Sequence, residues 1–345
     1  MTGVTVDRCP GVLRPHLAAD GAVVRIRVPG GQTTGTALAQ LGELAATYGS
    51  SLVQLTSRAS LQIRGLADPV QESFVAGVTA AGFLPSAAHD RVRNIVASPL
   101  TGLSGGRADL RPLIAALDEA LRAAADLAEL SGRFLFALDD GRGDVVTLPF
   151  DVAYQALDSD RGVVMVGDQR RLASATAAAT ALIEAARTRG LRPELVDGRE
   201  PPASTSSARI EAAPAVPLGA VGDHASVVVP LGFLTPEQLS AVSAAAGSGP
   251  VVVTPWRGLV IPYAATRLPE LAAVELVVDD ASPWTLVTAC VGAPYCGKAR
   301  MDTLAAARDL AERSGSSPLR RTHLSGCERR CGAPSTAHVD LVAHA

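Results

Sequence analysis

The chain has 345 residues, a formal net charge of -3, and a composition that is 48% hydrophobic and 19% charged. These values are typical of a globular protein of about two domains, and they argue against a strongly basic nucleic-acid-binding protein. No apolar run reaches the roughly 18 residues of a membrane-spanning helix, and no apolar secretory core is present near the N-terminus, so we expect a cytoplasmic protein with no membrane segment.

The first quarter of the chain predicts a strand, a helix and a second strand. Residues 23–28 alternate apolar and basic side chains, which is typical of a strand with one face against a core. Residues 37–48 place leucines on one stripe of a helix. Residues 51–66 then predict a strand that is interrupted by a polar turn at Ser57 and Arg58.

The middle of the chain predicts a separate unit. Residues 108–130 have a strongly amphipathic helical pattern, and residues 134–146 read as a β-hairpin turned at an Asp-Gly pair. Strand signal follows at residues 163–166, and residues 172–189 form an Ala-rich helical pattern that ends before a glycine.

The strand-helix-strand unit recurs at residues 226–262, where Thr235 and Pro236 open the helix. The second strands of the two units align at three positions that are each 198 residues apart: Thr56 with Thr254, Leu61 with Leu259, and Ile63 with Ile261. This spacing predicts an internal duplication, with two halves packed about a pseudo-twofold axis. The alternative is that any two strand-helix-strand units look alike.

Four of the five cysteines lie in two short clusters near the end of the chain, Cys290 and Cys296 in C-x5-C and Cys327 and Cys331 in C-x3-C. Four thiolates suit zinc or an iron-sulfur cluster, and the five-residue gap fits a zinc knuckle poorly. The glycines around both clusters suit loops that wrap a bulky inorganic core. The pattern therefore favours a 4Fe-4S cluster over zinc, over two disulfides, and over four unrelated buried thiols. Cys9 is expected to be an ordinary thiol.

Together with the cysteine clusters and the two-half organisation, the segments TSRASLQIRGL and RNIVASPLTG resemble the nitrite and sulfite reductase superfamily. Within it, the chain is similar to the precorrin-3B synthase family in RCPGVLRPHLAADGAVVRIRVPGG, RFLFALDDG and TPWRGL. The resemblance implies an α+β fold of two pseudo-symmetric halves, each a ferredoxin-like half-domain followed by an α/β block.

On this basis the chain is expected to divide into five segments. These are a first ferredoxin-like half-domain (1–92), a first α/β block (93–197), a Pro- and Ser-rich linker (198–217), a second ferredoxin-like half-domain (218–283), and a cluster-binding block (284–345). The last block is expected to be shortened, because only STAHVDLVAHA follows the CGAP segment that contains Cys331.

The resemblance implies that Cys290, Cys296, Cys327 and Cys331 ligate a 4Fe-4S cluster. In the reductases, the cysteine that matches Cys331 also bridges to siroheme, whereas precorrin-3B synthases are expected to add a mononuclear non-heme iron. Their reaction is a monooxygenation in aerobic cobalamin biosynthesis. It takes precorrin-3A and O2, hydroxylates C20 and closes a γ-lactone from the ring A acetate, with electrons from a separate reductase.

A tetrapyrrole substrate carries many carboxylates, which guanidinium groups bind in bidentate fashion. The matching motifs imply catalytic-pocket roles for Arg58, Arg93 and Arg133. Further candidates for substrate binding are Arg64, Arg257 and Lys298, while Arg329 and Arg330 lie inside the second cysteine cluster. For every arginine the alternative is a solvated surface side chain. His16, His89 and His323 lack a facial-triad spacing and are expected to be structural.

One departure bears on the reaction. The reductases carry a second cation two positions after the residue that matches Arg133, and here that position is Leu135. The loss weakens the binding of a small oxyanion and favours the oxygenase. The alternatives are a siroheme-dependent nitrite or sulfite reductase and a non-catalytic 4Fe-4S electron carrier.

Overall fold

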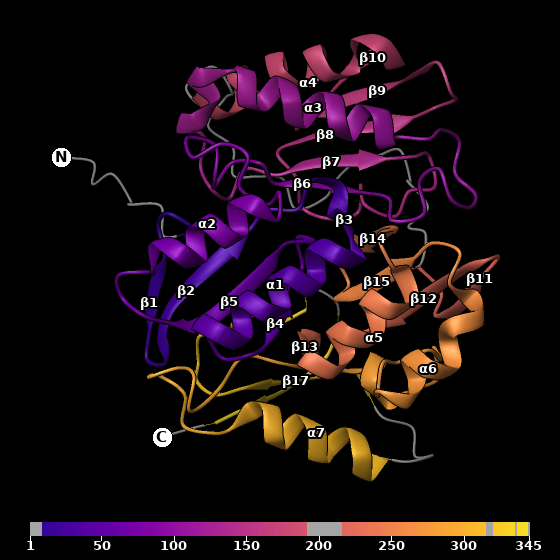
Figure 1. The fold of residues 1–345 in the computed structure, drawn as a ribbon. Helices are drawn as coiled ribbons and strands as arrows, with labels where there is room; N and C mark the ends of the chain where they lie inside the picture. Colours follow the sequence, from indigo (N-terminus) through magenta and orange to yellow (C-terminus); the bar gives the residue numbers. More distant parts are fainter. Residues whose placement is uncertain (1–8, 192–215, 315–319, 335–336, 344–345) are drawn as a thin grey trace.

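The computed structural model describes residues 9–191, 216–314, 320–334 and 337–343. Two β-sheets lie side by side in the middle of the molecule, an α/β block covers them on one side, and the cysteine-bearing segment lies on the opposite side (Figure 1). Within the described residues, no helix is long and apolar enough to cross a membrane. The predicted linker lies outside the described residues except for its last two positions.

The first half-domain contains a sheet, here called the first sheet, and two helices that pack on its apolar face. Its own elements are β1 (His16–Ala18), β2 (Gly21–Ile26), β3 (Gln32–Thr34), α1 (Gly35–Tyr48), β4 (Val53–Leu55), β5 (Leu61–Leu66) and α2 (Glu72–Ala80). Thr34 caps α1, because its side chain accepts a hydrogen bond from the amide of Ala37. Leu38 and Leu41 of α1 are fully buried against the sheet, as their spacing predicted.

The second half-domain repeats this arrangement around the second sheet. Its elements are β11 (Gly219–Val221), β12 (His224–Val228), β13 (Phe233–Leu234), α5 (Pro236–Ala246), β14 (Pro250–Val253), β15 (Gly258–Ile261) and α6 (Leu268–Ala273). Thr235 and Gln238 form a capping box at the start of α5, which confirms where this helix was expected to begin.

The two half-domains exchange edge strands. The first sheet has the order β1-β2-β5-β4-β13, and the second has the order β11-β12-β15-β14-β3. Phe233 of β13 pairs with Gln54 of β4, and Thr34 of β3 pairs with Pro250 of β14. Each sheet is thus completed by a strand from the other half, which the expected domain boundaries did not include.

Backbone details confirm the duplication and refine its spacing. Ala59 and Arg257, which are 198 residues apart, both have positive φ, at 50° and 60°. At the helix start the spacing is instead 201, from Thr34 to Thr235. The difference arises because α5 has 11 residues and α1 has 14.

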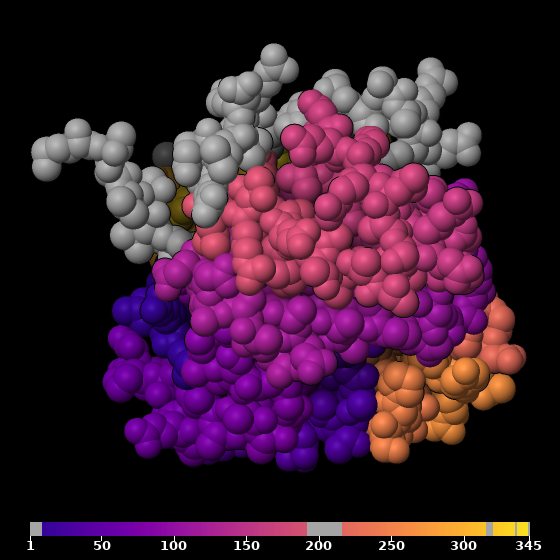
Figure 2. All heavy atoms as spheres, turned by 90° about the horizontal axis from the view of Figure 1, so that it is seen from above, coloured from indigo at the N-terminus to yellow at the C-terminus, as the bar shows by residue number. Residues whose placement is uncertain are grey.

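The first block has five strands and two helices among its named elements: β6 (Ile95–Ala97), α3 (Arg111–Ala123), β7 (Phe136–Asp139), β8 (Val152–Ala156), β9 (Arg161–Val166), β10 (Gln169–Ser174) and α4 (Ala178–Ala186). Seen from above, this block lies over both half-domains (Figure 2). β6, β7 and β8 are parallel neighbours, while β9 and β10 are antiparallel additions.

Three predictions for the first block need correction. The predicted hairpin at residues 134–146 is wrong, because β7 pairs in parallel with β8 and a loop of about a dozen residues joins them. The predicted helix over 108–130 stops at Ala123, and a short 3-10 turn follows it. The first residues of the predicted helix over 172–189 instead belong to β10.

The cysteine block contains β16 (Val287–Ala289), α7 (Thr303–Ser314), β17 (Thr322–Ser325) and β18 (Val339–Val342). Its three strands are parallel, in the order β16-β17-β18, like β6-β7-β8 of the first block. Apolar side chains of β16, β17 and α7 form a small core together with Leu231 of the second half-domain. Among the described residues, the block has no counterpart of β9, β10 or α4.

Candidate metal centre and arginine face

The four clustered cysteines lie in loops at one end of the cysteine block. Cys290 directly follows β16, and Cys327 and Cys331 lie in the loop after β17. Because β16 and β17 are parallel neighbours, their carboxyl ends meet at one edge. All four of these cysteines are free thiols, so the disulfide alternative is wrong.

The thiols lie close enough to influence one another. Burial raises the pKa of the Cys331 thiol, Arg329 opposes this rise, and the thiolates of Cys290, Cys327 and Cys296 add to it. Within the described residues, no three His, Cys, Asp or Glu side chains are gathered tightly enough to hold a single metal ion. Each ligand of a cubane cluster binds a different iron, so its cysteines stand further apart than the ligands of one ion. Four thiols are the donor set that a 4Fe-4S cluster takes.

Cys290 is held as a hydrogen-bond acceptor. The amide of Gly326 donates to Cys290 Sγ at 3.2 Å, and the hydroxyl of Thr303 donates to the Cys290 carbonyl at 2.6 Å. Gly292, with φ of 66°, packs so closely that an added Cβ would lie 2.2 Å from Thr303 Oγ1. Amide donors to a thiolate are the outer contacts that cluster ligands need.

Arg64 ties the first cysteine loop to the first sheet. Its guanidinium forms a bidentate ion pair with Asp20, at 3.1 and 2.9 Å, and donates to the carbonyl of Tyr295 at 2.8 Å. Both charged side chains are only 12% exposed. Tyr295 is next to Cys296, so Arg64 contacts the cysteine loop with a guanidinium that already has three acceptors.

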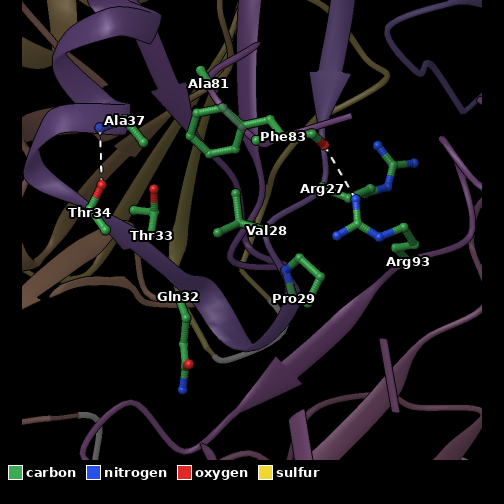
Figure 3. Close-up of a pocket in the computed structure, with 11 residues that line it drawn as sticks. Arg27, Val28, Pro29, Gln32, Thr33, Thr34, Ala37, Ala81, Phe83 and Arg93 are labelled. Carbon is green, nitrogen blue, oxygen red and sulfur yellow. Dashed lines mark hydrogen bonds between the residues drawn. The ribbon is translucent and has the colours of Figure 1, made fainter. Parts of the chain in front are cut away.

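The three arginines that were assigned to a catalytic pocket have different surroundings. Arg58 Nη1 donates to the carbonyl of Arg133 at 2.7 Å, so these two residues lie together, with the Arg133 side chain exposed. Arg93 is buried and forms an ion pair with Asp118, at 2.6 and 3.2 Å. It also donates to the carbonyl of Phe83 (Figure 3). Arg93 is therefore paired with a carboxylate inside the first half, and it lines the same cavity as Arg27 (Figure 3).

Arg257 and Lys298 also differ in their surroundings. Arg257 Nη2 donates to the carbonyl of Gly332 at 3.4 Å, one residue beyond Cys331, while its Nη1 is buried without a partner. Burial lowers the pKa of the Arg257 guanidinium. Lys298, by contrast, is exposed.

Two arginines that sequence reasoning did not select carry the largest unmet hydrogen-bonding capacity. Arg27 is 2% exposed, and among the described residues its Nε and Nη2 have no partner, nor has Arg25 Nε. Burial lowers the pKa of Arg25 and lowers that of Arg27 to about 9, with Arg25 adding to the second effect. The alternation in residues 23–28 placed both arginines on one face, which was the signal available.

We call this surface of the first sheet the arginine face, defined by Arg25, Arg27, Gln54 and Gln62. Gln62 donates to Gln54 at 2.8 Å and accepts from Arg25 at 3.4 Å. Arg64 lies two residues beyond Gln62 on β5, so the two side chains are on the same face of the sheet. The hydrogen bond from Arg64 to Tyr295 therefore shows what this face is turned toward. The arginine face is therefore turned toward the cysteine block.

The two cavities near the first half-domain are not the macrocycle site. One has a volume of about 240 Å³ and is lined by Thr33, Phe83 and Arg93 among others (Figure 3). The other has about 290 Å³ and lies between Ser98 and Val252. Pockets for drug-sized ligands span roughly 300–1,000 Å³, so neither cavity holds a tetrapyrrole.

Comparisons with known proteins agree with this arrangement. Residues 16–80 match the family model described as the nitrite/sulfite reductase ferredoxin-like half domain. The precorrin-3B synthase of Sinorhizobium sp is 26% identical, over 97% of this chain and 80% of the relative. The ferredoxin–nitrite reductase of Synechococcus elongatus is 28% identical, over 93% and 76%. The structure of Mycobacterium tuberculosis NirA superposes with a TM-score of 0.67 at 18% identity, over 90% of this chain and 69% of NirA, and so shares the fold. The chain is therefore similar, over nearly its whole length, to members of the nitrite and sulfite reductase superfamily.

Proposed function

We propose that this oxidoreductase acts as a precorrin-3B synthase, converting a carboxylate-rich tetrapyrrole with O2. One observation carries the proposal: the loops that contain four free thiols lie against a sheet face on which several buried guanidinium nitrogens lack partners among the described residues. The similarity to the Sinorhizobium enzyme over 97% of the chain supports the choice of substrate class.

In this proposal Cys290, Cys296, Cys327 and Cys331 hold a 4Fe-4S cluster. When bound, the cluster supplies one-electron transfer between an external reductase and the substrate site. The protein contributes the Gly326 amide as a donor to Cys290 Sγ and Arg64 as the anchor of the Cys296 loop.

The arginine face binds the carboxylates of the macrocycle. Unpaired buried donors cost about 1–3 kcal/mol each, and more when the group is charged, so Arg25 and Arg27 are destabilising until an anion reaches them. Arg257 offers a further unpaired nitrogen near the second cysteine loop, and Arg58 with Arg133 lies at the rim. Guanidinium groups on one plane suit a flat ligand with peripheral carboxylates.

The reaction balances only with an electron donor. One oxygen atom of O2 is retained in the C20 hydroxyl of the product, and the other leaves as water. This consumes two electrons and two protons beyond those of precorrin-3A. The ring A acetate closes the γ-lactone. A separate reductase therefore has to dock near the cysteine loops.

A second candidate is a siroheme-dependent nitrite or sulfite reductase, favoured by the similarity to the Synechococcus enzyme. Its small oxyanion needs a dense set of cations. Leu135, which takes the place of the second cation, is only 4% exposed and packs in the main core, so it adds no charge to the site. A cluster-bearing electron carrier without catalysis is the third candidate.

Anaerobic purification followed by a visible spectrum and a turnover assay separates the three. The proposed enzyme shows a broad thiolate-to-iron band without siroheme bands, and it converts precorrin-3A under O2 with a reductase present. Siroheme bands with nitrite or sulfite turnover would select the second candidate. A cluster without any turnover would select the carrier.

A further inference from the structure

The hydroxyl of Ser325 is a buried polar group without a partner. Ser325 is the last residue of β17 and is 0% exposed, and no atom of the described residues forms a hydrogen bond with its Oγ. His323, two residues earlier on the same face, is also fully buried, and its Nε2 has no partner. Leaving a buried hydroxyl unpaired is destabilising, so its position calls for a ligand.

The first block has an equivalent of the Ser325 position. Ser98 follows β6 as Cys290 follows β16, and their amides donate to equivalent leucine carbonyls of β7 and β17, Leu138 at 3.0 Å and Leu324 at 2.9 Å. Their side chains accept equivalent amides, Asp140 to Ser98 Oγ at 3.1 Å and Gly326 to Cys290 Sγ at 3.2 Å. By this register, Asp139 is the counterpart of Ser325.

Asp139 points into the loop that follows its strand. Its carboxylate accepts four amides of that loop, from Gly141 at 2.9 Å, Gly143 at 2.9 Å, Val145 at 3.2 Å and Val146 at 3.4 Å. The equivalent loop after β17 contains Cys327 and Cys331. The same face of this sheet lies beneath the loop, since Arg330 of the loop forms an ion pair at 3.0 Å with Asp340, the residue of β18 in register with His323.

We infer that the Ser325 hydroxyl donates a hydrogen bond to a sulfur atom of the cluster that the four cysteines hold, and thereby raises its reduction potential. The inference rests on the metal centre of the proposed function. Reduction adds negative charge to the cluster, so a donor aimed at its sulfur atoms stabilises the reduced form. A carboxylate at this position, as in the first block, would oppose reduction. Ser325 is thus a tuning residue and not a ligand.

The test uses full-length protein with its cluster and compares three variants with the parent. Ser325→Ala removes the donor, and Ser325→Thr keeps it. Thr322→Val removes a hydroxyl from the opposite face of β17, where it donates to the Arg320 carbonyl at 2.8 Å. The midpoint potential is measured by redox titration monitored by electron paramagnetic resonance. Exchangeable protons coupled to the reduced cluster are measured in parent protein by electron-nuclear double resonance in H2O and D2O.

We expect Ser325→Ala to shift the midpoint potential to more negative values, Ser325→Thr to restore it, and Thr322→Val to leave it unchanged. A loaded Ser325→Ala protein with the parent potential overturns the inference, as does an equal shift in Thr322→Val. If Ser325→Ala does not load, the parent measurement decides, because no exchangeable coupled proton means no such bond. A parent that takes up no cluster overturns both this inference and the proposed metal centre. A loaded parent that fails to convert precorrin-3A counts against the proposed activity alone.

Discussion

The first and second sheets have the same topology, but the faces that they turn toward the covering blocks differ in polarity. The repeat spacing makes Arg25 of β2 equivalent to Ser226 of β12, and Arg27, just after β2, equivalent to Val228. By the same spacing, the paired glutamines of the first sheet, Gln54 and Gln62, are equivalent to the paired valines Val252 and Val260 of the second sheet.

The contacts made by these surfaces differ accordingly. Val252 and Val260 form a small apolar cluster with Leu100 of the first block, so that face is closed by packing. The arginine face instead retains unpartnered guanidinium nitrogens and is turned toward free thiols. The duplication thus built two similar surfaces, and only one of them kept the polar groups that a charged ligand requires.

The largest effect is expected from Cys290→Ser, which gives the cysteine block the residue that the first block has at Ser98. The hydroxyl can still accept the Gly326 amide but is a poor ligand for iron, so we expect iron content to fall roughly tenfold or more. Cys9→Ser is the matched control and should keep its iron. Metal analysis and the visible spectrum measure both. A fully loaded Cys290→Ser protein would remove this cysteine from the ligand set.

Next in size is the double variant Arg25→Ser with Arg27→Val, which gives the first sheet the side chains of the second. Losing charge-assisted hydrogen bonds should weaken tetrapyrrole binding roughly tenfold to a hundredfold. Removing unpaired buried charges should also stabilise the ligand-free protein, by on the order of 1 kcal/mol.

Titration with precorrin-3A and thermal unfolding measure the two effects of this double variant. Arg161→Ser, at an exposed ion pair with Asp158, is the control. Unchanged affinity in the double variant would mean that the substrate binds elsewhere.

A smaller effect is expected from Arg64→Met, because position 262, its counterpart in the second sheet, is a proline without such an anchor. The Tyr295 loop should loosen and the cluster should be lost to a chelator several-fold faster, as for other outer contacts of metal ligands. Arg267→Met, which removes an exposed ion pair, is the control. Equal rates of cluster loss in parent and Arg64→Met would show that this ion pair has no role in holding the loop.

The smallest effect concerns pH and the first block. Burial raises the pKa of Asp144 from 3.8 to about 6, and its Oδ2 has no hydrogen-bond partner. The folded state therefore binds a proton that the unfolded state releases, and stability falls as pH rises through this interval, by on the order of 1 kcal/mol. Asp144→Asn should flatten this dependence. Hydrogen exchange of the β7 amides at several pH values measures it, and identical slopes in parent and variant would contradict it.

The spacing of residues was enough to predict the duplication, and it also singled out the four clustered cysteines. The repeat was visible because the second strands of both units keep their apolar positions, such as Leu61 and Leu259, in register. The cysteines were visible because thiols are rare and two close pairs seldom arise without a ligand.

What remained hidden depends on long-range contacts. Arg25 and Arg27 looked like the solvated side of a strand, and only packing of the rest of the chain buries them. Arg93 looked like Arg58, but Asp118 on a distant helix neutralises it. The wrong hairpin after Phe134 came from an Asp-Gly pair whose loop Asp139 organises through four amides, which local turn preferences do not encode.

The exchanged strands β3 and β13 explain how such unequal sheets can coexist. A solitary ancestral unit of this kind would leave an open edge and would complete its sheet only by borrowing a strand from an identical twin. Every substitution in that twin pair would appear twice. Once the two copies are fused into one polypeptide, each can take its own substitutions. One copy can then be adapted to bind an anion while the other is kept for its packing.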